Sequence, residues 1–241
     1  MTEGKRFPWL AVILGVGCLG ILCVFIVVGL LFAVSLIVPS VKSVDEVVTA
    51  EANGRPMVDD NTMGNPNAPI KMEQFSDYQC PFCARYFEET EDQVVEAYVA
   101  TGKVYYVYRS FGAFIGPESQ AAAEAAYCAG DQNKYWEYHD ILFANQIGEN
   151  VGAYADSRLQ AFAEELSLDM DAFNSCFSGG KYADRVEQDY LDGSSAGVTG
   201  TPGFLITYTV DGEERQRFIA GAYPFSEFQT QFDGALAEMG Q

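Results

Sequence analysis

The chain has 241 residues, of which 34 are acidic and 14 are basic, so its formal net charge at pH 7 is −20. A negative charge of this size repels the phosphate backbone, which argues against binding to nucleic acid. Its length suits one well-packed domain, with or without an insert, preceded by a shorter segment.

That preceding segment is predicted to cross a membrane. Residues 7–38 contain no charged side chain, and a helix of this length exceeds the roughly 30 Å apolar core of a bilayer. Lys5 and Arg6 precede it and should stay in the cytoplasm. We therefore expect an uncleaved signal anchor in residues 1–39, with 8–38 in the membrane. The protein would be a single-pass cell-membrane protein with an extracytoplasmic C-terminal domain. A cleaved signal peptide is the alternative, although no small-residue cleavage site follows the apolar run.

Residues 40–64 are polar and are predicted to form a linker, which leaves 65–241 for the domain. Its composition predicts a strand over 70–75, a helix over 84–100 and a second strand over 103–108. Strand, helix and strand in this order indicate a βαβ unit with a parallel strand pair.

The helix over 84–100 is expected to bury one face and expose the other. Phe87, Val94 and Tyr98 are assigned to the buried face. The acidic residues are assigned to the exposed face: Glu88, Glu89, Glu91 and Asp92.

The region from about 112 to 197 is predicted to be a helical insert. Its expected helices cover 121–129, 134–145, 158–166, 171–177 and 182–191. The chain then returns to strands over 204–210 and 215–220, and Asp211-Gly212 between them predicts a hairpin. A last helix over 224–238 would complete an α/β fold.

A Cys-x-x-Cys stretch joins the first strand to its helix: Ser76-Asp77-Tyr78-Gln79-Cys80-Pro81-Phe82-Cys83. Pro81 suits a first helical position, which places Cys80 at the positive end of the helix. That field favours a thiolate, the nucleophile of disulfide exchange, and Cys83 lies one turn further on. The pattern predicts a redox-active dithiol, tuned by Pro81 and Phe82. Half of a zinc site is the alternative, but the sequence has no second close Cys or His pair, so no metal is predicted.

A second motif, Gly200-Thr201-Pro202-Gly203, leads into the strand that starts at Phe204. A bond that precedes proline is the one kind that becomes cis at modest cost. Together with the dithiol stretch and the helical insert, this motif resembles the DsbA-type thiol–disulfide oxidoreductases. Those proteins have a thioredoxin-like fold with an inserted α-helical domain, and the resemblance covers about 65–240.

The resemblance implies roles for four residues. Cys80 would be the attacking cysteine and Cys83 the buried cysteine that resolves a mixed disulfide. Thr201 and Pro202 would form a cis-proline loop that lies against the dithiol and pairs its backbone with an extended substrate.

The resemblance also implies a structural disulfide between Cys128 and Cys176, because several DsbA-like proteins have a second disulfide in the insert. Two free thiols in the core are the alternative. Cys18 and Cys23 lie in the apolar segment and are read as ordinary residues of a membrane helix.

Two residues depart from the family pattern. Many thioredoxin-fold enzymes have a buried acid six residues before the first cysteine, where this chain has Gln74. Glu73 is adjacent, but in a strand it points to the opposite face. Strongly oxidising members often have histidine between the cysteines, and here Phe82 takes that position. We therefore expect a Cys80 pKa that is lowered, but not to the extreme.

The resemblance implies an extracytoplasmic enzyme that oxidises cysteine pairs in secreted or membrane proteins, and a membrane quinone-linked partner that re-oxidises it. A disulfide reductase or isomerase on the same fold is one alternative, and a non-catalytic binding or chaperone-like module is another. No cofactor is predicted, because the only Gly-x-Gly-x-x-Gly pattern, residues 15–20, lies inside the apolar segment.

Overall fold

The structure is a computed structural model, and it describes residues 47–49, 54–112 and 114–241. All of these belong to one compact unit, Ser43–Gln241. The predicted membrane segment lies outside the described residues. Within the described ranges, no helix combines the length and the apolar character that crossing a bilayer requires.

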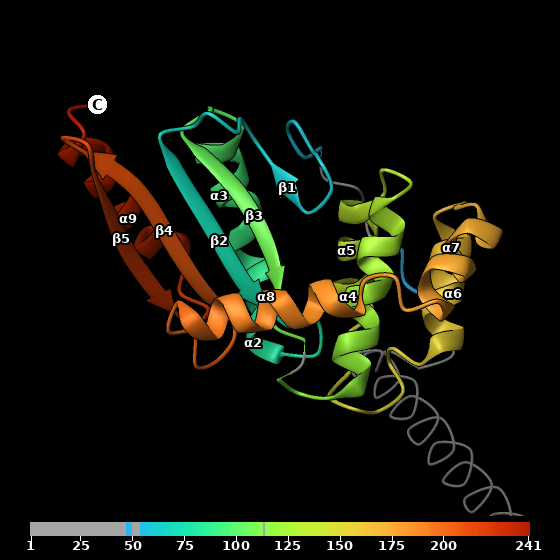
Figure 1. The fold of residues 1–241 in the computed structure, drawn as a ribbon. Helices are drawn as coiled ribbons and strands as arrows, with labels where there is room; N and C mark the ends of the chain where they lie inside the picture. The colour runs from blue at the N-terminus through green and yellow to red at the C-terminus, as the bar shows by residue number, and fades with distance from the viewer. Residues whose placement is uncertain (1–46, 50–53, 113) are drawn as a thin grey trace, which may run out of the picture. The chain divides into compact units, whose positions relative to one another are not determined.

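A five-stranded mixed sheet lies at the centre of this unit, with its strands in the order β1-β3-β2-β4-β5 (Figure 1). The strands are β1 (Thr62–Met63), β2 (Ile70–Ser76), β3 (Val104–Ser110), β4 (Gly203–Val210) and β5 (Glu213–Ala220). β2 runs parallel to β3, and the other three neighbouring pairs are antiparallel. The predicted βαβ unit and the hairpin between β4 and β5 are confirmed.

The helix that follows β2 runs from Pro81 to Val99 and alternates between α-helical and π-helical turns. Its parts are α2 (Pro81–Tyr86), η1 (Phe87–Glu91), α3 (Asp92–Val94) and η2 (Val95–Val99). Together with α9 (Phe225–Glu238), this helix covers one face of the sheet, whereas α8 (Ala183–Ser195) packs on β2 and β3 from the other face (Figure 1).

Side chains of β2 alternate between these two faces, as the pleat of a strand requires. Met72 and Gln74 are buried on the side of the long helix, and Phe75 packs on the α8 side against Phe111. A Cβ atom on Gly193 of α8 would come within 2.7 Å of the Phe75 ring. Glycine at this position therefore lets α8 approach the sheet closely.

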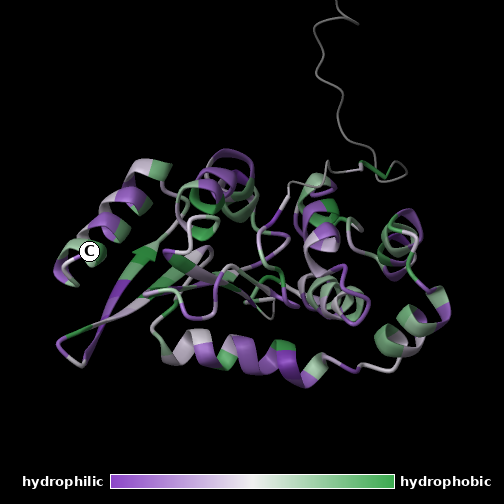
Figure 2. Cartoon of the chain, turned by 90° about the horizontal axis from the view of Figure 1, so that it is seen from above, coloured by the Kyte–Doolittle hydropathy of each residue, from purple (hydrophilic) through white to green (hydrophobic). Residues whose placement is uncertain are grey.

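The predicted helical insert lies between β3 and β4 and is confirmed. It contains α4 (Pro117–Gly130), α5 (Tyr135–Ala144), α6 (Asp156–Glu165), α7 (Met170–Ser178) and α8. Figure 2 shows hydrophilic and hydrophobic residues on different sides of these helices, as expected for helices at a protein surface. A disulfide between Cys128 and Cys176 joins α4 to α7 across a Cα–Cα distance of 5.8 Å.

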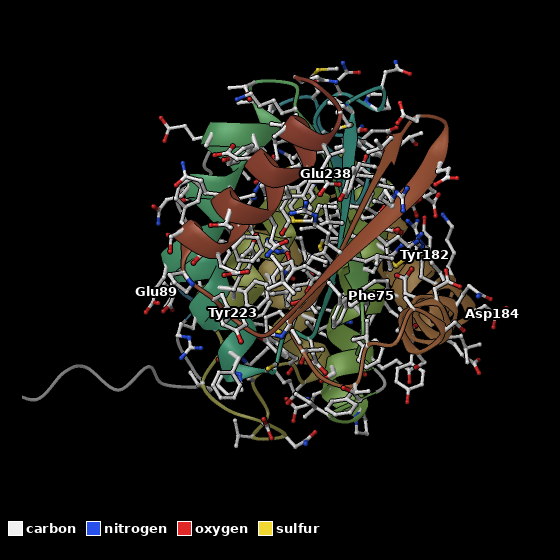
Figure 3. The ribbon with its side chains drawn as sticks, turned by 90° about the vertical axis from the view of Figure 1, so that its left-hand side faces the viewer. Phe75, Glu89, Tyr182, Asp184, Tyr223 and Glu238 are labelled. Atoms are coloured by element: carbon white, nitrogen blue, oxygen red, sulfur yellow. A yellow bond between two sulfur atoms is a disulfide. The ribbon has the colours of Figure 1, made fainter. Side chains whose placement is uncertain are left out.

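The assignment of Glu91 to the exposed face of the long helix is wrong. Its side chain is 0% exposed, whereas Glu88, Glu89 and Asp92 are exposed, and Figure 3 shows Glu89 at the outer edge of the helix. Glu91 follows Phe87 by four residues, a spacing that places both side chains on one face.

Residues before β2 contribute to the fold although 40–64 is predicted as a linker. The Arg55 side chain is 4% exposed, and its guanidinium lies 2.7 Å from Glu91 Oε1 and 2.5 Å from Asp140 Oδ1. His139 is buried, with its Nδ1 2.9 Å from Asp140 Oδ1. Arg55 thus ties the N-terminal segment to both the long helix and the insert.

Candidate active site

Cys80 is the residue immediately before α2, and Pro81 occupies the first position of that helix. The Cys80 carbonyl accepts hydrogen bonds from the N–H groups of Cys83 and Ala84, at 3.0 and 3.1 Å, which form the first helical turn. Cys80 and Cys83 are both free thiols. Cys80 is 5% exposed and Cys83 is 0% exposed, so only the first sulfur is accessible to another molecule.

The pKa of Cys80 is lowered to about 6. The largest cause is the side-chain hydrogen bond with Cys83, which outweighs the opposing effect of burial. Thr201 and the backbone N–H groups of Phe82 and Cys83 lower it further. The helix N-terminus therefore contributes, but the partner thiol contributes more.

Cys83 has the opposite behaviour. Burial raises its pKa well above the ordinary value, and the neighbouring Cys80 raises it further. The backbone N–H of Asp77 lies 3.5 Å from the Cys83 Sγ and opposes this rise only in part. At neutral pH the pair therefore has one thiolate, on Cys80, and one thiol, on Cys83.

The loop that contains Thr201 and Pro202 lies against the dithiol. The peptide bond between these residues is cis, and the thiol of Cys80 lies 3.4 Å from the Thr201 carbonyl oxygen. Pro202 is buried, and its carbonyl accepts a hydrogen bond of 2.8 Å from the N–H of Gly221. The fold thus brings together two motifs that are about 120 residues apart in the chain.

A shallow groove of about 410 Å³ lies beside Phe82 of α2 and Thr201 of the cis-proline loop. It is lined by Phe82, Arg85, Thr201, Ala220, Gly221, Ala222 and Tyr223. Phe82 and Tyr223 are 54% and 49% exposed, and Figure 3 shows Tyr223 at the surface of this region. The guanidinium of Arg85 lies 5.1 Å from the centre of the Phe82 ring. The groove therefore offers apolar surface and one cation beside the reactive sulfur.

Sequence reasoning missed the contacts that the insert makes with the active-site turn. The side chain of Gln146 donates hydrogen bonds of 2.9 Å to the carbonyls of both Tyr78 and Cys80. Gln79 donates to Ser119 at 2.7 Å. The residues in each pair are 40 to 68 positions apart, so no local pattern in the sequence indicates them.

Gln74, which stands where many family members have a buried acid, and its neighbour Glu73 lie on opposite faces of β2. Gln74 is buried and accepts a hydrogen bond from the Tyr106 hydroxyl. Glu73 is on the α8 side, where it pairs with Arg109 at 3.0 Å and with Lys71 at 2.9 Å. The prediction that Glu73 points away from the dithiol face is confirmed.

Comparisons with known proteins agree with this geometry. The family model described as Thioredoxin matches residues 57–223. The α-DsbA1 structure from Wolbachia pipientis is 26% identical, with a TM-score of 0.65, and the match covers 77% of this chain and 94% of that one. "Probable disulfide bond formation protein D" from Bacillus cereus is 25% identical, over 60% of this chain and 68% of that protein.

A further relative is named Na(+)/H(+) antiporter NhaA 1, from Salinispora arenicola. It is 33% identical over 148 residues, which are 61% of this chain and 21% of that protein. The matched part therefore spans about a fifth of the length of this relative.

The insert, the dithiol at a helix start and the cis-proline loop together give this domain the arrangement expected of the DsbA-like thiol–disulfide oxidoreductases. The chain belongs to the thioredoxin family, whose model matches more than half of its residues. The individual roles assigned to Cys80, Cys83, Thr201 and Pro202 stay predictions of the sequence that this geometry permits.

Proposed function

We propose that this protein is an oxidase that transfers its Cys80–Cys83 disulfide to pairs of cysteine thiols in other proteins. The observation that carries the proposal is a Cys80 with a pKa of about 6 that lies 3.4 Å from the Thr201 carbonyl. A stabilised thiolate favours the reduced form, so the disulfide form is a stronger oxidant. The value lies between those of about 7 in thioredoxin and about 3.5 in DsbA, which supports an intermediate oxidising strength.

The exchange proceeds in two steps. A substrate thiolate attacks Cys80 Sγ and forms a mixed disulfide, while the Cys80–Cys83 bond breaks and Cys83 takes up a proton. A second substrate thiolate then attacks the substrate sulfur of the mixed disulfide and releases the Cys80 thiolate. Two substrate thiols are oxidised and the two cysteines of the protein are reduced.

Unfolded polypeptides are the proposed substrates. The exposed rings of Phe82 and Tyr223 suit apolar side chains that a folded protein would bury. The backbone beside Pro202 suits a chain in extended conformation.

We further propose that residues 8–38 tether the protein to the cell membrane with its domain outside the cytoplasm. The Cys128–Cys176 disulfide suits a compartment in which disulfides persist. The reduced dithiol is then re-oxidised by a membrane quinone-linked partner, whose local concentration such a tether would raise.

Refolding of a reduced, disulfide-requiring protein tests the proposal. The full-length chain should accelerate recovery of the substrate, and Cys80→Ala should abolish the acceleration. A Cys80→Ala variant with unchanged effect would favour a chaperone-like module. Equilibration with glutathione tests the direction, because a potential near about −270 mV would favour a reductase over an oxidase. Labelling of Cys80 in intact cells by a membrane-impermeant thiol reagent tests the location, and protection of Cys80 until the membrane is opened would contradict it.

A further inference from the structure

Each turnover of the dithiol requires a proton to move at a sulfur that water does not reach. Cys83 is 0% exposed and its pKa is raised by burial, so it gains a proton when the disulfide opens and must lose that proton before it attacks again. Gln74, which is buried on the same face of β2 as the long helix, has an amide side chain that does not titrate. A different group must therefore transfer the proton.

Asp77 contacts both cysteines through its backbone. Its N–H lies 3.5 Å from the Cys83 Sγ, and its carbonyl accepts a hydrogen bond of 3.0 Å from the N–H of Cys80. The residue is 1% exposed. Asp77 is thus fixed beside the pair by the same turn that delivers Cys80 to the helix start.

The carboxyl group of Asp77 is buried without full compensation of its charge. Oδ1 accepts a hydrogen bond of 2.9 Å from the N–H of Gln79. Oδ2 is buried and lacks a hydrogen bond of normal geometry, although Ser119 and the Ile115 backbone lie close enough to favour the charged form. No ion pair among the described residues includes this carboxyl.

The surroundings of the Asp77 carboxyl shift its pKa into the pH range in which a proton can be exchanged with Cys83. Burial raises the pKa of Asp77 to about 7, and the charge of Cys80 adds to the rise. Tyr108 and Tyr154 also face this carboxyl, but burial raises the pKa of both phenols well above 10. Between pH 5 and pH 9, roughly, the titrating groups at this site are therefore Asp77 and Cys80.

We propose that Asp77 is the proton carrier for Cys83, an assignment that rests on the thiol–disulfide exchange proposed above. When the Cys80–Cys83 bond opens, the carboxylic acid of Asp77 gives its proton to the departing Cys83 thiolate. When the pair is re-oxidised, the carboxylate takes the proton from the Cys83 thiol. The new thiolate then attacks Cys80 in the mixed disulfide, and the carboxyl afterwards releases the proton to water.

Dithiobis(nitrobenzoate), used at one equivalent on the reduced full-length chain, separates the steps. Cys80 attacks the reagent first and releases one coloured thiolate. Cys83 must then lose its proton to displace the second thiolate, so the second phase of colour reports the proposed transfer. Asp77→Asn keeps the oxygen that accepts from Gln79, and Glu73→Gln on the opposite face of β2 is the matched control.

We expect Asp77→Asn to leave the first phase unchanged within twofold and to slow the second at least tenfold at pH 7. The wild-type second phase should rise with pH and level off above pH 7, whereas that of Asp77→Asn should rise with hydroxide throughout. In Asp77→Glu, the rate of the second phase should again level off at high pH, because this variant keeps a carboxyl group. An unchanged second phase, or equal slowing of both phases, would overturn the assignment. A wild-type chain that releases no coloured thiolate would instead contradict the proposed function.

A second measurement does not depend on a variant that folds. Infrared difference spectra of the reduced wild-type chain with carbon-13-labelled aspartate, recorded between pH 5.5 and pH 8.5, should lose a labelled carboxylic acid band as the buried Asp77 carboxyl releases its proton at a pKa of about 7. Spectra without such a band would contradict the proposal even if Asp77→Asn could not be purified.

Discussion

Two of the regions of this domain that bury carboxylates treat their charges in opposite ways. Beside the long helix, Glu91 and Asp140 share the guanidinium of Arg55. Burial alone would raise the pKa of Asp140, but the hydrogen bond from His139 and the charge of Arg55 hold it below its usual value. In the active-site turn, Asp77 is buried with no such cation among the residues that the structure describes, and burial raises its pKa to about 7. The fold therefore keeps Asp140 ionised and allows Asp77 to change its protonation near neutral pH.

Removal of the cation from the first region should have the largest effect on stability. Arg55→Met leaves two buried carboxylates without their partner, which typically costs about 3–5 kcal/mol. Because the Asp140 pKa is depressed in the folded state, this loss should be complete near pH 7 and should shrink as the pH falls below about 4. Urea unfolding at both pH values measures it.

Arg215→Met is the matched control for that variant. Its side chain is 52% exposed and pairs with Glu213, which is 72% exposed, so the expected loss is about 0–0.5 kcal/mol. Equal losses in the two variants would show that Arg55 acts as an ordinary surface arginine, contrary to the buried pairing described above.

The second region should respond to pH in the opposite sense. The Asp77 pKa is raised on folding, so its contribution to stability is present below the unfolded value of about 3.8 and is lost as the pH rises through about 7. Asp77→Asn abolishes this loss. The free energy of unfolding of the reduced variant, minus that of the reduced wild type, should therefore increase by about 2–4 kcal/mol between pH 4 and pH 8.

Oxidation sharpens that prediction, because the disulfide form has no Cys80 thiolate to raise the Asp77 pKa. The increase in the unfolding free energy of Asp77→Asn relative to the wild type between pH 4 and pH 8 should therefore be smaller in the oxidised protein. Paired urea titrations of the reduced and oxidised forms test this, and a gain that is independent of pH would show that Asp77 does not titrate in the folded state.

The sequence was informative where a residue type has few structural uses. Pro81 after a cysteine and Pro202 before a strand indicated a helix start and a proline loop, and the structure places them within reach of one sulfur. The charge of Glu91 predicts an exposed side chain, but its spacing of four residues from Phe87 places it on the buried face of the helix. The partner that makes its burial tolerable, Arg55, is 36 residues earlier in a stretch with the composition of a linker.

In the active-site turn, too, the sequence does not reveal partners that are distant in the chain. An aspartate two residues before an N–H that it can accept from is typical of a turn, so Asp77 invites a purely structural reading. Among the groups that favour its charged form, the largest contribution comes from Ser119 of the insert, which no local pattern connects to it. The chemistry of Asp77 therefore becomes visible only once the insert is seen to cover the turn.

Gln146 should have an intermediate effect, because it joins that insert to the turn. Gln146→Leu leaves the carbonyls of Tyr78 and Cys80 without these donors, at an expected cost of about 1–3 kcal/mol. The Cys80 pKa should shift little, since Gln146 contacts its carbonyl rather than its sulfur. Thermal unfolding and the pH profile of thiol alkylation measure the two effects, and a large pKa shift at normal stability would reverse this assignment.

Glu73 provides the smallest expected effect and the strictest test of the comparison between the two regions. It is an acid close to the dithiol in sequence, but it lies on the α8 side of β2 with Arg109 and Lys71 as partners. Glu73→Gln leaves Arg109 its contact with Asp189 at 2.9 Å, so the cost should be about 0.5–1 kcal/mol, as for a partly exposed pair. Both phases of thiolate release should match those of the wild type at every pH. If the second phase slowed in this variant as well, proximity in sequence rather than the face of the strand would decide which acid serves Cys83.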